Sequence, residues 1–327
     1  MENARAERIA VVIPSFKVTR HILGVIAAIP AEVERIFVVD DACPEGSGKL
    51  VQSDCRDPRV TVLFHERNQG VGGAVMTGYQ AAIAAGCLVL VKIDGDGQMD
   101  PSRIAEFVRP IVAGEADYTK GNRFFDLERI REMPRMRLVG NAILSFMTKL
   151  SSGYWDLFDP TNGYTAIHAS VASHLPFAQI SSRYFFETDM LFRLNTLRAV
   201  VVDIPMDAQY GDEQSNLKIR RIVGEFLWKH VRNFGKRIFY NYYLRDMSLA
   251  SVELPFGTAL LAFGVTFGGW QWARAIQLGT ATPIGTVMLA ALTSLMGLQL
   301  ILAFLANDIA SVPRRAIHRR FPQGRVR

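Results

Sequence analysis

The sequence predicts an α/β domain with a mostly parallel sheet, followed by an amphipathic helix and a pair of long apolar helices. Short apolar runs alternate with helical stretches over residues 1–218, and parallel strands need such crossover connections. A basic amphipathic stretch occupies 219–246. Two uncharged apolar stretches within 247–310 are each long enough to cross a bilayer, and a basic tail follows at 311–327. We therefore expect four parts with these boundaries.

Four short apolar runs predict the first strands of the sheet: residues 8–15, 35–39, 60–64 and 88–93. Pro14 stops the first run, and Thr19 is placed to cap the helix that follows it through Ala28. Residues 118–121 are a candidate for a further short strand. Parallel α/β sheets bind ligands at the carboxyl ends of their strands, so a nucleotide-binding domain is expected.

The fourth strand runs into the stretch KIDGDGQMDP at residues 92–101. Asp94 and Asp96 follow the strand two residues apart, and Asp100 with Pro101 predicts the N-cap and first turn of the next helix, through Val112. Mg²⁺ is usually shared between one or two carboxylates and substrate phosphates. The stretch therefore indicates a metal–diphosphate site.

These motifs also allow other interpretations. An EF-hand loop needs Gly at its sixth position and Glu at its twelfth, where this chain has Met99 and Ala105. The alternative without a binding role is a solvated acidic turn. Gly70 and Gly72 suggest a dinucleotide fingerprint, but its third glycine would fall on Val75 and the cluster lies in the third strand–helix unit. These glycines either let a helix begin close to a nucleotide or pack tightly on the sheet.

Composition narrows the class of partner. The formal net charge is +6 and the sequence pI is about 9.3, with the positive charge concentrated after Lys218, so we expect a membrane and no nucleic acid as the anionic partner. Three cysteines without metal-ligand spacing or even pairing are typical of a reducing cytosol. The apolar run at 9–13 is too short for a signal peptide.

Two helices with basic faces are expected, at 133–152 and at 219–243. Such a helix often packs on a core, and that alternative stays open for the first one. The second carries Arg220, Arg221, Lys229, Arg232 and Lys236 opposite an apolar face with aromatic residues, which is typical of a helix lying in a membrane interface.

The stretches 254–273 and 278–306 contain no charged residue, and a short connection makes them a hairpin. Trp270 and Trp272 lie where an interfacial aromatic belt would be. Basic residues flank both outer ends of the hairpin: Lys236, Arg237, Arg245, Arg314, Arg315, Arg319 and Arg320. The positive-inside rule then predicts a multi-pass protein of the cell (inner) membrane, with the α/β domain and both termini cytoplasmic. Two buried core helices of a soluble protein are the alternative.

Seven motifs occur in an order typical of one enzyme family. They are VVIPSF at 11–16, VVDDACPEGSG at 38–48, NQGVGGAVMTGY at 68–79, DGDGQMDP at 94–101, GNRF at 121–124, DPTNGY at 159–164 and ETDML at 187–191. In this order they resemble family 2 glycosyltransferases of the GT-A fold. Among these, the chain is similar to dolichol-phosphate mannose synthase and the bacterial polyprenyl-phosphate glycosyltransferases.

The resemblance implies a membrane-bound, metal-dependent inverting hexosyltransferase. It would move a sugar from a UDP- or GDP-linked donor to undecaprenyl or dolichyl phosphate with Mg²⁺ or Mn²⁺. Asp96 would be the direct metal ligand, Asp94 would share the metal or lie near the ribose, and Gln98 would hydrogen-bond the sugar or the acceptor phosphate. Asp189 is the matching acid of the last motif. It need not be an obligatory base, because a lipid phosphate is already anionic at neutral pH.

The resemblance also implies two binding sets. Nucleotide-binding residues would be Pro14, Ser15, Asp40, Asp41, Asn68 and Gly72. Acceptor-phosphate residues would be Arg123, Arg137, Asn141, Ser215 and Lys218. For the arginines the alternative is plain surface charge or lipid headgroup contact. A homo-oligomer stays open.

Three departures from the family pattern stand out. Lys17-Val18 replaces a usual Asn-Glu, Cys43 replaces a usual Ser, and residues 207–215 lack a usual Arg. Two alternatives remain open. One is a processive polysaccharide synthase, whose Gln-x-x-Arg-Trp motif is absent from this sequence, and the other is a catalytically silent membrane scaffold.

Overall fold

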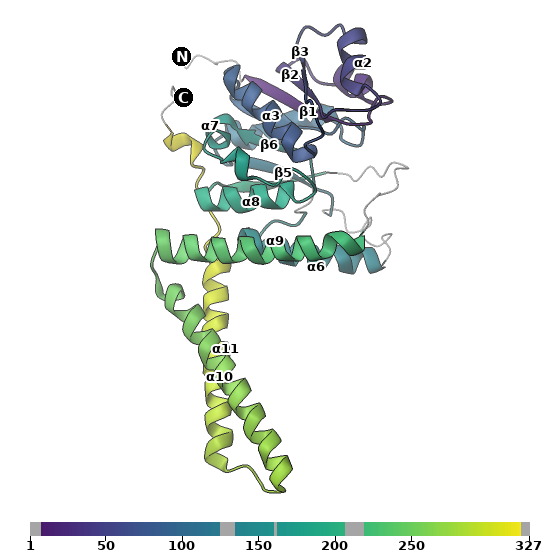
Figure 1. Ribbon diagram of the computed structural model, residues 1–327. Coiled ribbons are helices and arrows are strands. Elements are labelled where there is room, and N and C mark those ends of the chain that lie inside the picture. The colour runs from purple at the N-terminus through teal and green to yellow at the C-terminus, as the bar shows by residue number, and fades with distance from the viewer. Residues whose placement is uncertain (1–7, 125–134, 160–161, 207–218, 322–327) are drawn as a thin grey trace. The chain divides into compact units, whose positions relative to one another are not determined.

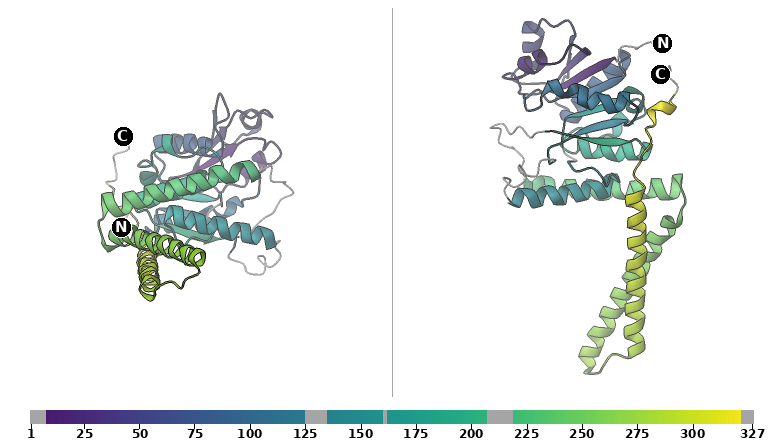
Figure 2. Two further views of the ribbon diagram at one scale, coloured as in Figure 1. Left: turned by 60° about the horizontal axis from the view of Figure 1, so that its bottom comes forward. Right: turned by 180° about the vertical axis from the view of Figure 1, so that it is seen from behind.

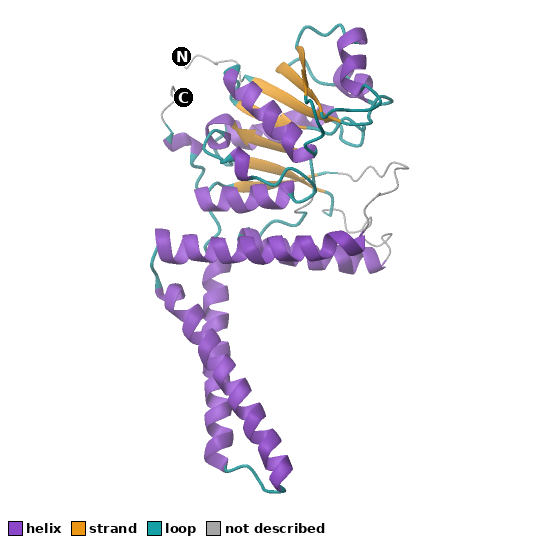
Figure 3. Cartoon of the chain, in the orientation of Figure 1, coloured by secondary structure: helices purple, strands orange, loops and turns teal. Residues whose placement is uncertain are grey.

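The computed structural model describes residues 8–124, 135–159, 162–206 and 219–321, and the side chains within these ranges except at 135–137 and 219–223. Figure 3 shows a strand-containing part and a set of long helices. Two compact units are present: residues 1–234 together with 313–327, and residues 235–312. Each is described by itself below.

A seven-stranded sheet forms the centre of the first unit, in the order β3-β2-β1-β4-β6-β5-β7 (Figure 1). Its strands are β1 (Ile9–Ser15), β2 (Val33–Asp40), β3 (Val60–Phe64), β4 (Val89–Lys92), β5 (Tyr118–Asn122), β6 (Thr165–His168) and β7 (Val201–Pro205). β6 runs antiparallel to both of its neighbours, and all other pairs are parallel. The expected α/β fold with a mostly parallel sheet is confirmed, including the short strand predicted at 118–121.

Helices cover both faces of this sheet. α1 (Ile22–Ala27), α2 (Ser47–Asp54) and α4 (Ile104–Val112) pack on one face, and α3 (Val71–Ala84), α7 (Ala169–Ala172) and α8 (Phe186–Leu197) pack on the other. Short 3₁₀ turns precede α4, at Pro101–Arg103, and α8, at Phe177–Gln179. Gly78 of α3 lies so close to Val12 that an added Cβ would approach it to 2.3 Å. A glycine here lets α3 lie directly on the sheet.

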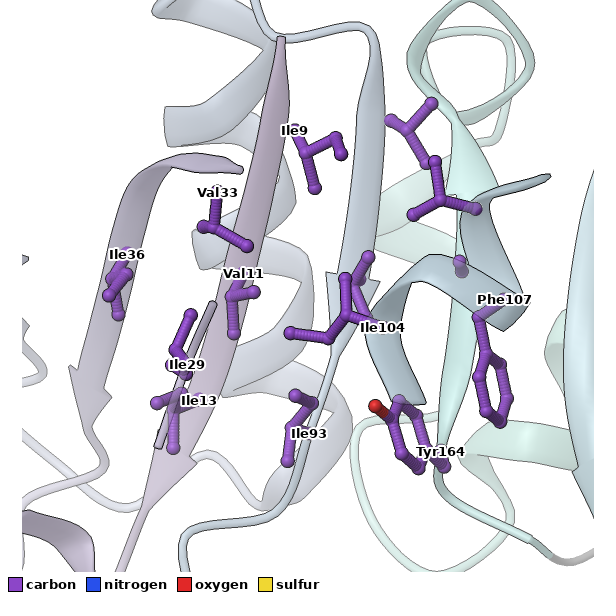
Figure 4. Packing of buried hydrophobic residues seen from close by; sticks show 14 of the residues in the cluster. Ile9, Val11, Ile13, Ile29, Val33, Ile36, Ile93, Ile104, Phe107 and Tyr164 are labelled. Carbon is purple, nitrogen blue, oxygen red and sulfur yellow. The ribbon is translucent and has the colours of Figure 1, made fainter. Parts of the chain in front are cut away.

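Alternation along the strands divides their side chains between the two faces. Ile9, Val11 and Ile13 of β1 point into the core on the α1, α2 and α4 side, where they meet Ile104 (Figure 4). Phe107 stacks on Tyr164 there, with ring centroids 3.9 Å apart. Burying each such side chain stabilises the fold by about 1.5–3 kcal/mol, so this face holds β1 and β4 firmly in the middle of the sheet.

The helix after β1 begins later than predicted. α1 starts at Ile22, and its N-cap is His21, which makes no side-chain capping bond. Thr19 lies in the turn before it, so the predicted Thr19 cap is wrong. The backbone instead satisfies the first donors, because the amides of His21 and Ile22 both donate to the carbonyl of Val18.

The two predicted amphipathic helices are present as α6 (Arg135–Ser152) and α9 (Ile219–Phe239), and a π-helical turn, Tyr240–Arg245, continues α9. Both helices can be followed in the views of Figure 2. α6 packs on α8 but leaves several large apolar side chains exposed: Leu138, Val139, Ile143 and Phe146. Leu227, Trp228 and Val231 of α9 are exposed as well. Core packing therefore accounts for only part of each apolar face.

The second unit contains two long helices, α10 (Leu249–Leu278) and α11 (Ile284–Ala310). Both are long and apolar enough to cross a membrane, and only 22% and 11% of their most apolar windows are buried. Helices of a soluble core would be mostly buried. They pack through small residues: a Cβ on Gly257 would come within 3.0 Å of the Gly297 carbonyl, and one on Gly264 within 2.3 Å of Ser294.

An ion pair closes the base of this hairpin. Arg237 donates from Nη1 and Nη2 to the two carboxylate oxygens of Asp308, at 2.6 and 2.9 Å, and both side chains are 1% exposed. Tyr242 donates to the same carboxylate at 2.7 Å. Arg237, one of the basic residues that flank the hairpin, therefore has its charge buried against Asp308.

The chain after the hairpin returns to the first unit. The buried carboxylate of Asp117, at the start of β5, accepts bonds from the amides of Ile317 and His318 and from the His318 ring at 2.7 Å. The His318 ring also stacks on His168, with centroids 4.4 Å apart. The segment through the short 3₁₀ turn His318–Arg320 is therefore docked on the α/β domain.

Candidate active site

Several strands end at one edge of the sheet, where the predicted site residues gather. The strand registers pair Ser15 of β1 with Asp40 of β2, and Val12 of β1 with Lys92 of β4. Thr165, the first residue of antiparallel β6, pairs with both Lys92 and Lys120. The carboxyl ends of β1, β2, β4 and β5 therefore share an edge with the start of β6.

Asp94 and Asp96 lie just beyond β4 at this edge. An Asp94 oxygen is 2.8 Å from the Lys92 ammonium, while 29% of the Asp94 side chain stays exposed. Asp96 accepts a bond from the amide of Gln98 at 3.0 Å, which folds the loop around its own carboxylate. Asp100 caps the next turn by accepting from the Ser102 amide, as predicted. The two carboxylates are thus held in place but reachable from solvent.

This donor set fits a hard divalent cation. Both candidate ligands offer carboxylate oxygens, which Mg²⁺ and Mn²⁺ prefer. Among the described residues no group of three or more His, Cys, Asp or Glu side chains could hold a metal ion. A cation held by Asp94 and Asp96 would therefore complete its shell with water and diphosphate oxygens, which is the usual habit of Mg²⁺.

Asp40 and Asp41 each organise a loop at the edge. The Asp40 carboxylate accepts from the amides of Cys43 and Gly48 at 2.7 and 2.6 Å. The Asp41 carboxylate accepts from the amides of Gln69 and Gly70 at 2.7 and 2.8 Å. Both acids are buried, so each shapes a wall of the site in addition to any contact with a nucleoside.

Asn68 and Ser15 complete this side of the edge. The Asn68 amide donates to the Asp41 carbonyl at 3.2 Å. Ser15, which follows Pro14 at the end of β1, is 1% exposed, and its hydroxyl has no hydrogen-bond partner among the residues that the structure describes. A buried hydroxyl without a partner costs free energy, which a bound group at the strand end would recover.

Two of the departures from the family pattern contact each other. The Lys17 amide donates to Cys43 Sγ at 3.1 Å, and the thiol is 2.8 Å from the Ser47 hydroxyl. Lys17 and Ala42 both have positive φ, 60° and 53°, which costs about 1 kcal/mol for a non-glycine residue. The Cys43 thiol therefore ties the loop after β1 to the strained loop after β2.

The glycines before α3 serve packing. Gly72 donates to the Ser182 carbonyl at 2.8 Å, and a Cβ on Gly72 would come within 2.7 Å of the Phe186 ring. Gly70 has a φ of +87°, and a Cβ there would come within 2.5 Å of the Ser182 carbonyl. The amides that open α3 are thus directed at the loop before α8. These glycines therefore allow close packing against the loop before α8, and the role of Gly72 at a nucleotide stays a prediction.

Two acids of the ETDML motif point in different directions. Residues two apart on an α-helix are turned by about 200° from each other. Asp189 accepts from the Ser181 amide at 2.8 Å and from the Asn233 side chain at 3.0 Å, so it joins α8 to a loop and to α9. Glu187 instead faces the metal motif, 4.0 Å from the Lys92 ammonium. Sequence reasoning chose Asp189 and missed Glu187 and Lys92.

Burial and charge shift the pKa of these groups. Burial lowers the pKa of Lys92, but Asp94 and Glu187 outweigh it, and the net shift is upward. Burial raises the pKa of Glu187, although Lys92 and Lys120 oppose this. Lys120 is fully buried and has its pKa lowered to about 8, chiefly by desolvation. The surroundings of Lys92 therefore favour its charged form, whereas those of Lys120 disfavour it.

The predicted acceptor residues are only partly described. Arg123 is paired with the buried Asp159, with Nε 2.8 Å from one carboxylate oxygen and Nη2 3.2 Å from the other. Asn141 lies on α6 and is half-buried. Arg137 lies two residues after the start of α6, but its side chain is outside the described part of the chain, and Ser215 and Lys218 lie wholly outside it.

Comparison with known proteins adds the family context. The profile named Glycosyl transferase family 2 matches residues 10–175. A UDP-N-acetylglucosamine–dolichyl-phosphate N-acetylglucosaminyltransferase of Methanococcus voltae is 27% identical over 218 residues, which cover 62% of this chain and 86% of that protein. An undecaprenyl-phosphate mannosyltransferase of Micrococcus luteus is 29% identical over 192 residues, covering 58% and 78%.

Solved structures agree on the fold. Glucosyl-3-phosphoglycerate synthase from Mycobacterium tuberculosis, in complex with UDP, superimposes with a TM-score of 0.53 at 17% identity and covers 71% of this chain and 80% of that one. The same enzyme with Mn²⁺, UDP-glucose and phosphoglyceric acid gives a TM-score of 0.52. At this identity the likeness shows the fold alone.

Proposed function

The chain belongs to glycosyl transferase family 2, and from that premise we propose that it is a membrane-bound inverting hexosyltransferase that moves a sugar from a nucleotide sugar to a polyprenyl phosphate. The observation that carries the proposal is the pair of reachable carboxylates, Asp94 and Asp96, at the ligand-binding edge of the sheet. The names of several relatives supply the acceptor class: dolichyl phosphate, undecaprenyl phosphate and polyprenol.

The donor would lie across the edge formed by β1, β2 and β4. Asp40, Asp41 and Ser15 would line the nucleoside side, where the two acids already fix the loops and Ser15 has an unpartnered hydroxyl. Asp94 and Asp96 would hold Mg²⁺ or Mn²⁺, which supplies Lewis-acid stabilisation of the charge on the departing diphosphate. Either a uridine or a guanosine donor suits this arrangement.

The acceptor would approach from the opposite side of the metal motif. A polyprenyl phosphate carries its nucleophilic oxygen as an anion, so the protein has to position this oxygen rather than deprotonate it. Direct attack on the anomeric carbon would invert its configuration. Arg123 would contact the acceptor phosphate while it stays paired with Asp159. The other proposed contacts to this phosphate are Arg137, Asn141, Ser215 and Lys218.

The membrane context supports a lipid acceptor. α10 and α11 are membrane-long and leave apolar surface exposed, and α6 and α9 present apolar side chains. In this proposal both termini and the α/β domain are cytoplasmic, and the basic tail agrees with that orientation. An interfacial helix next to the site would keep a phosphate at headgroup depth within reach.

A panel of labelled UDP- and GDP-sugars incubated with membranes tests the proposal directly. We expect one donor to give a lipid-linked sugar in a reaction that EDTA abolishes. Asp96→Asn should lower the turnover at least about 100-fold while the protein stays folded, because a lost ligand charge weakens both metal and diphosphate binding. Asp100→Asn is the matched control, since asparagine caps a helix as well as aspartate does. Full activity of Asp96→Asn in chelator-treated membranes would refute the assignment.

Arg137→Ala tests the proposed acceptor side. A guanidinium matches a phosphate in geometry as well as in charge, so lysine should substitute imperfectly. We expect the variant to weaken use of the lipid phosphate far more than it weakens donor binding measured by calorimetry. Equal losses in both would place Arg137 on the donor side or in the fold, and no loss in either would leave it as surface charge.

A further inference from the structure

Lys92 is a buried ammonium directly beneath the metal motif. Its side chain is 2% exposed, and its Nζ lies 2.8 Å from Asp94 Oδ1. Lys92 ends β4 and shares the sheet face of Val12, its register partner, on which α3 packs. Two residues further on, Asp94 returns to this same side of the chain, which brings the two charges together.

A second carboxylate and a glycine confine this ammonium. Glu187 from the first turn of α8 lies 4.0 Å away. The backbone at Gly163, just before β6, passes so close that a Cβ there would lie 2.4 Å from Lys92 Nζ and 2.9 Å from Asp94 Oδ2. Two separate segments therefore confine the Lys92–Asp94 pair and leave its members little freedom to turn.

This confinement decides what Lys92 can do. A side chain that is 2% exposed cannot reach a bound diphosphate without leaving its place. It can, however, fix the orientation of Asp94 by engaging Oδ1, while 29% of the Asp94 side chain stays exposed at the edge. A fixed positive charge also offsets part of the repulsion among Asp94, Asp96 and Glu187 while no cation is bound.

Resting on the proposed function, we propose that Lys92 is a positioning residue that holds Asp94 in the orientation required to bind the divalent cation. Glu187 is the second anchor of the same ammonium and acts through it. Residues that orient metal ligands typically change metal affinity 10–100-fold when they are removed. Lys92→Met, which keeps the length of the side chain and removes the charge, should therefore weaken Mn²⁺ binding by about that factor.

The chain offers a matched control. Lys120 is also a fully buried lysine, at the corresponding end of β5, but its ammonium donates to the Asn162 carbonyl and has no described contact with Asp94. Lys120→Met should destabilise the fold as a buried-charge change does and leave Mn²⁺ affinity within about 3-fold.

The test uses the full-length protein in detergent with Mn²⁺ alone, and free Mn²⁺ is counted by electron paramagnetic resonance. Because no sugar or lipid is present, the result is independent of the proposed reaction. If no donor in the panel reacts but Lys92→Met still loses Mn²⁺ affinity, then the transferase proposal fails and the role of Lys92 stands. Wild-type affinity in a folded Lys92→Met, or no Mn²⁺ binding by the wild type, overturns the role of Lys92.

A double-mutant cycle separates positioning from a general structural effect. If Lys92 acts through Asp94, then Lys92→Met combined with Asp94→Asn should bind Mn²⁺ no more weakly than Asp94→Asn alone. Effects that multiply would overturn the proposal. If Lys92→Met does not fold, Gly163→Ala displaces the same pair without removing a charge and should weaken Mn²⁺ binding about 10-fold. Unchanged binding by Gly163→Ala would count against the proposal equally.

Discussion

Two buried cation–carboxylate pairs, one in each unit, are built in opposite ways. At the hairpin base, Arg237 engages both oxygens of Asp308, both side chains are 1% exposed, and Tyr242 takes up a further acceptor site. At the sheet edge, the Lys92 ammonium lies 2.8 Å from Oδ1 of Asp94, and 29% of the Asp94 side chain is exposed.

The difference separates a permanent pair from one that can admit a ligand. A carboxylate whose oxygens are both engaged and buried has little left to offer a cation, and breaking such a pair strands an uncompensated charge. A carboxylate that is paired with a cation but still partly exposed is oriented and can still accept a ligand. The geometry of partners and exposure therefore distinguishes structural from functional ion pairs, whereas sequence shows only the charges.

Breaking the hairpin pair should give the largest change in stability. We expect Arg237→Ala to lower the free energy of unfolding of the hairpin by about 3–5 kcal/mol, since Asp308 would be left buried and unpaired. Denaturant titration in detergent, followed by the fluorescence of Trp270 and Trp272, measures it. Arg245→Ala is the control, because its pair with the 75%-exposed Asp246 should contribute no more than about 1 kcal/mol. Equal losses in the two variants would contradict the comparison.

Acid should act on one unit more than on the other. Burial lowers the pKa of His230 and of His168 to about 4, from an ordinary value of 6.5. The neutral forms are favoured in the folded state, so this stability is complete above pH 6.5, is lost progressively as the pH falls from 6.5 to 4, and changes little below 4. Residues 235–312 contain no histidine.

At pH 4.5 we therefore expect the α/β domain to lose about 2–3 kcal/mol for His230 relative to pH 7. Unfolding followed by the fluorescence of Trp155 and Trp228, in a variant with phenylalanine at 270 and 272, would measure this. His230→Gln should remove the His230 share of the dependence between pH 6.5 and 4 and leave that of His168. A pH profile identical to that of the wild type would show that His230 is not the titrating group.

The carboxylate of Asp117 extends the comparison of paired carboxylates, because it is fully buried and several of its partners come from the end of the chain. Asp117 accepts from the Val200 amide and from the docked segment around His318. His318→Ala should lower the free energy of unfolding of the α/β domain by about 1.5–3 kcal/mol, the range for hydrogen bonds to charged groups. His174→Ala, which removes an exposed ring stacked on Phe321, should cost less. Chemical denaturation measures the free energy of unfolding of both variants. A larger loss for His174→Ala than for His318→Ala would refute the anchoring role of His318.

The smallest effect is expected within the metal loop itself. Asp100 accepts from the Ser102 amide at 2.9 Å and caps the turn before α4. Asp100→Ala should cost about 1 kcal/mol of stability and leave Mn²⁺ affinity unchanged. A loss of Mn²⁺ affinity like that expected for Asp96→Asn would mean that Asp100 belongs to the cation site.

Much of the fold could be predicted from sequence because its determinants are local. Apolar runs with short connections specified β1 to β4, and the placement of Asp94 and Asp96 after a strand indicated the edge at which they would lie. The two long uncharged helices could be predicted without tertiary information, since length and composition alone make a helix able to cross a bilayer.

Contacts between distant segments were decided only by the tertiary structure. The sequence placed two acids in ETDML, but the orientation of α8 turned Glu187 toward Lys92 and Asp189 toward Asn233. It placed glycines before α3, but the loop at Ser182 showed why they must be small. Such pairings depend on how helices pack on the sheet, and no local pattern encodes that.

The charged residues show the same division. Lysines and arginines in the sequence predicted a basic protein at a membrane, and this follows from composition alone. Which of those charges are paired was decided by partners far along the chain: Asp308 for Arg237, and Asp159 for Arg123. A buried charge without an oppositely charged partner is strongly destabilising, and only the fold brings that partner into place.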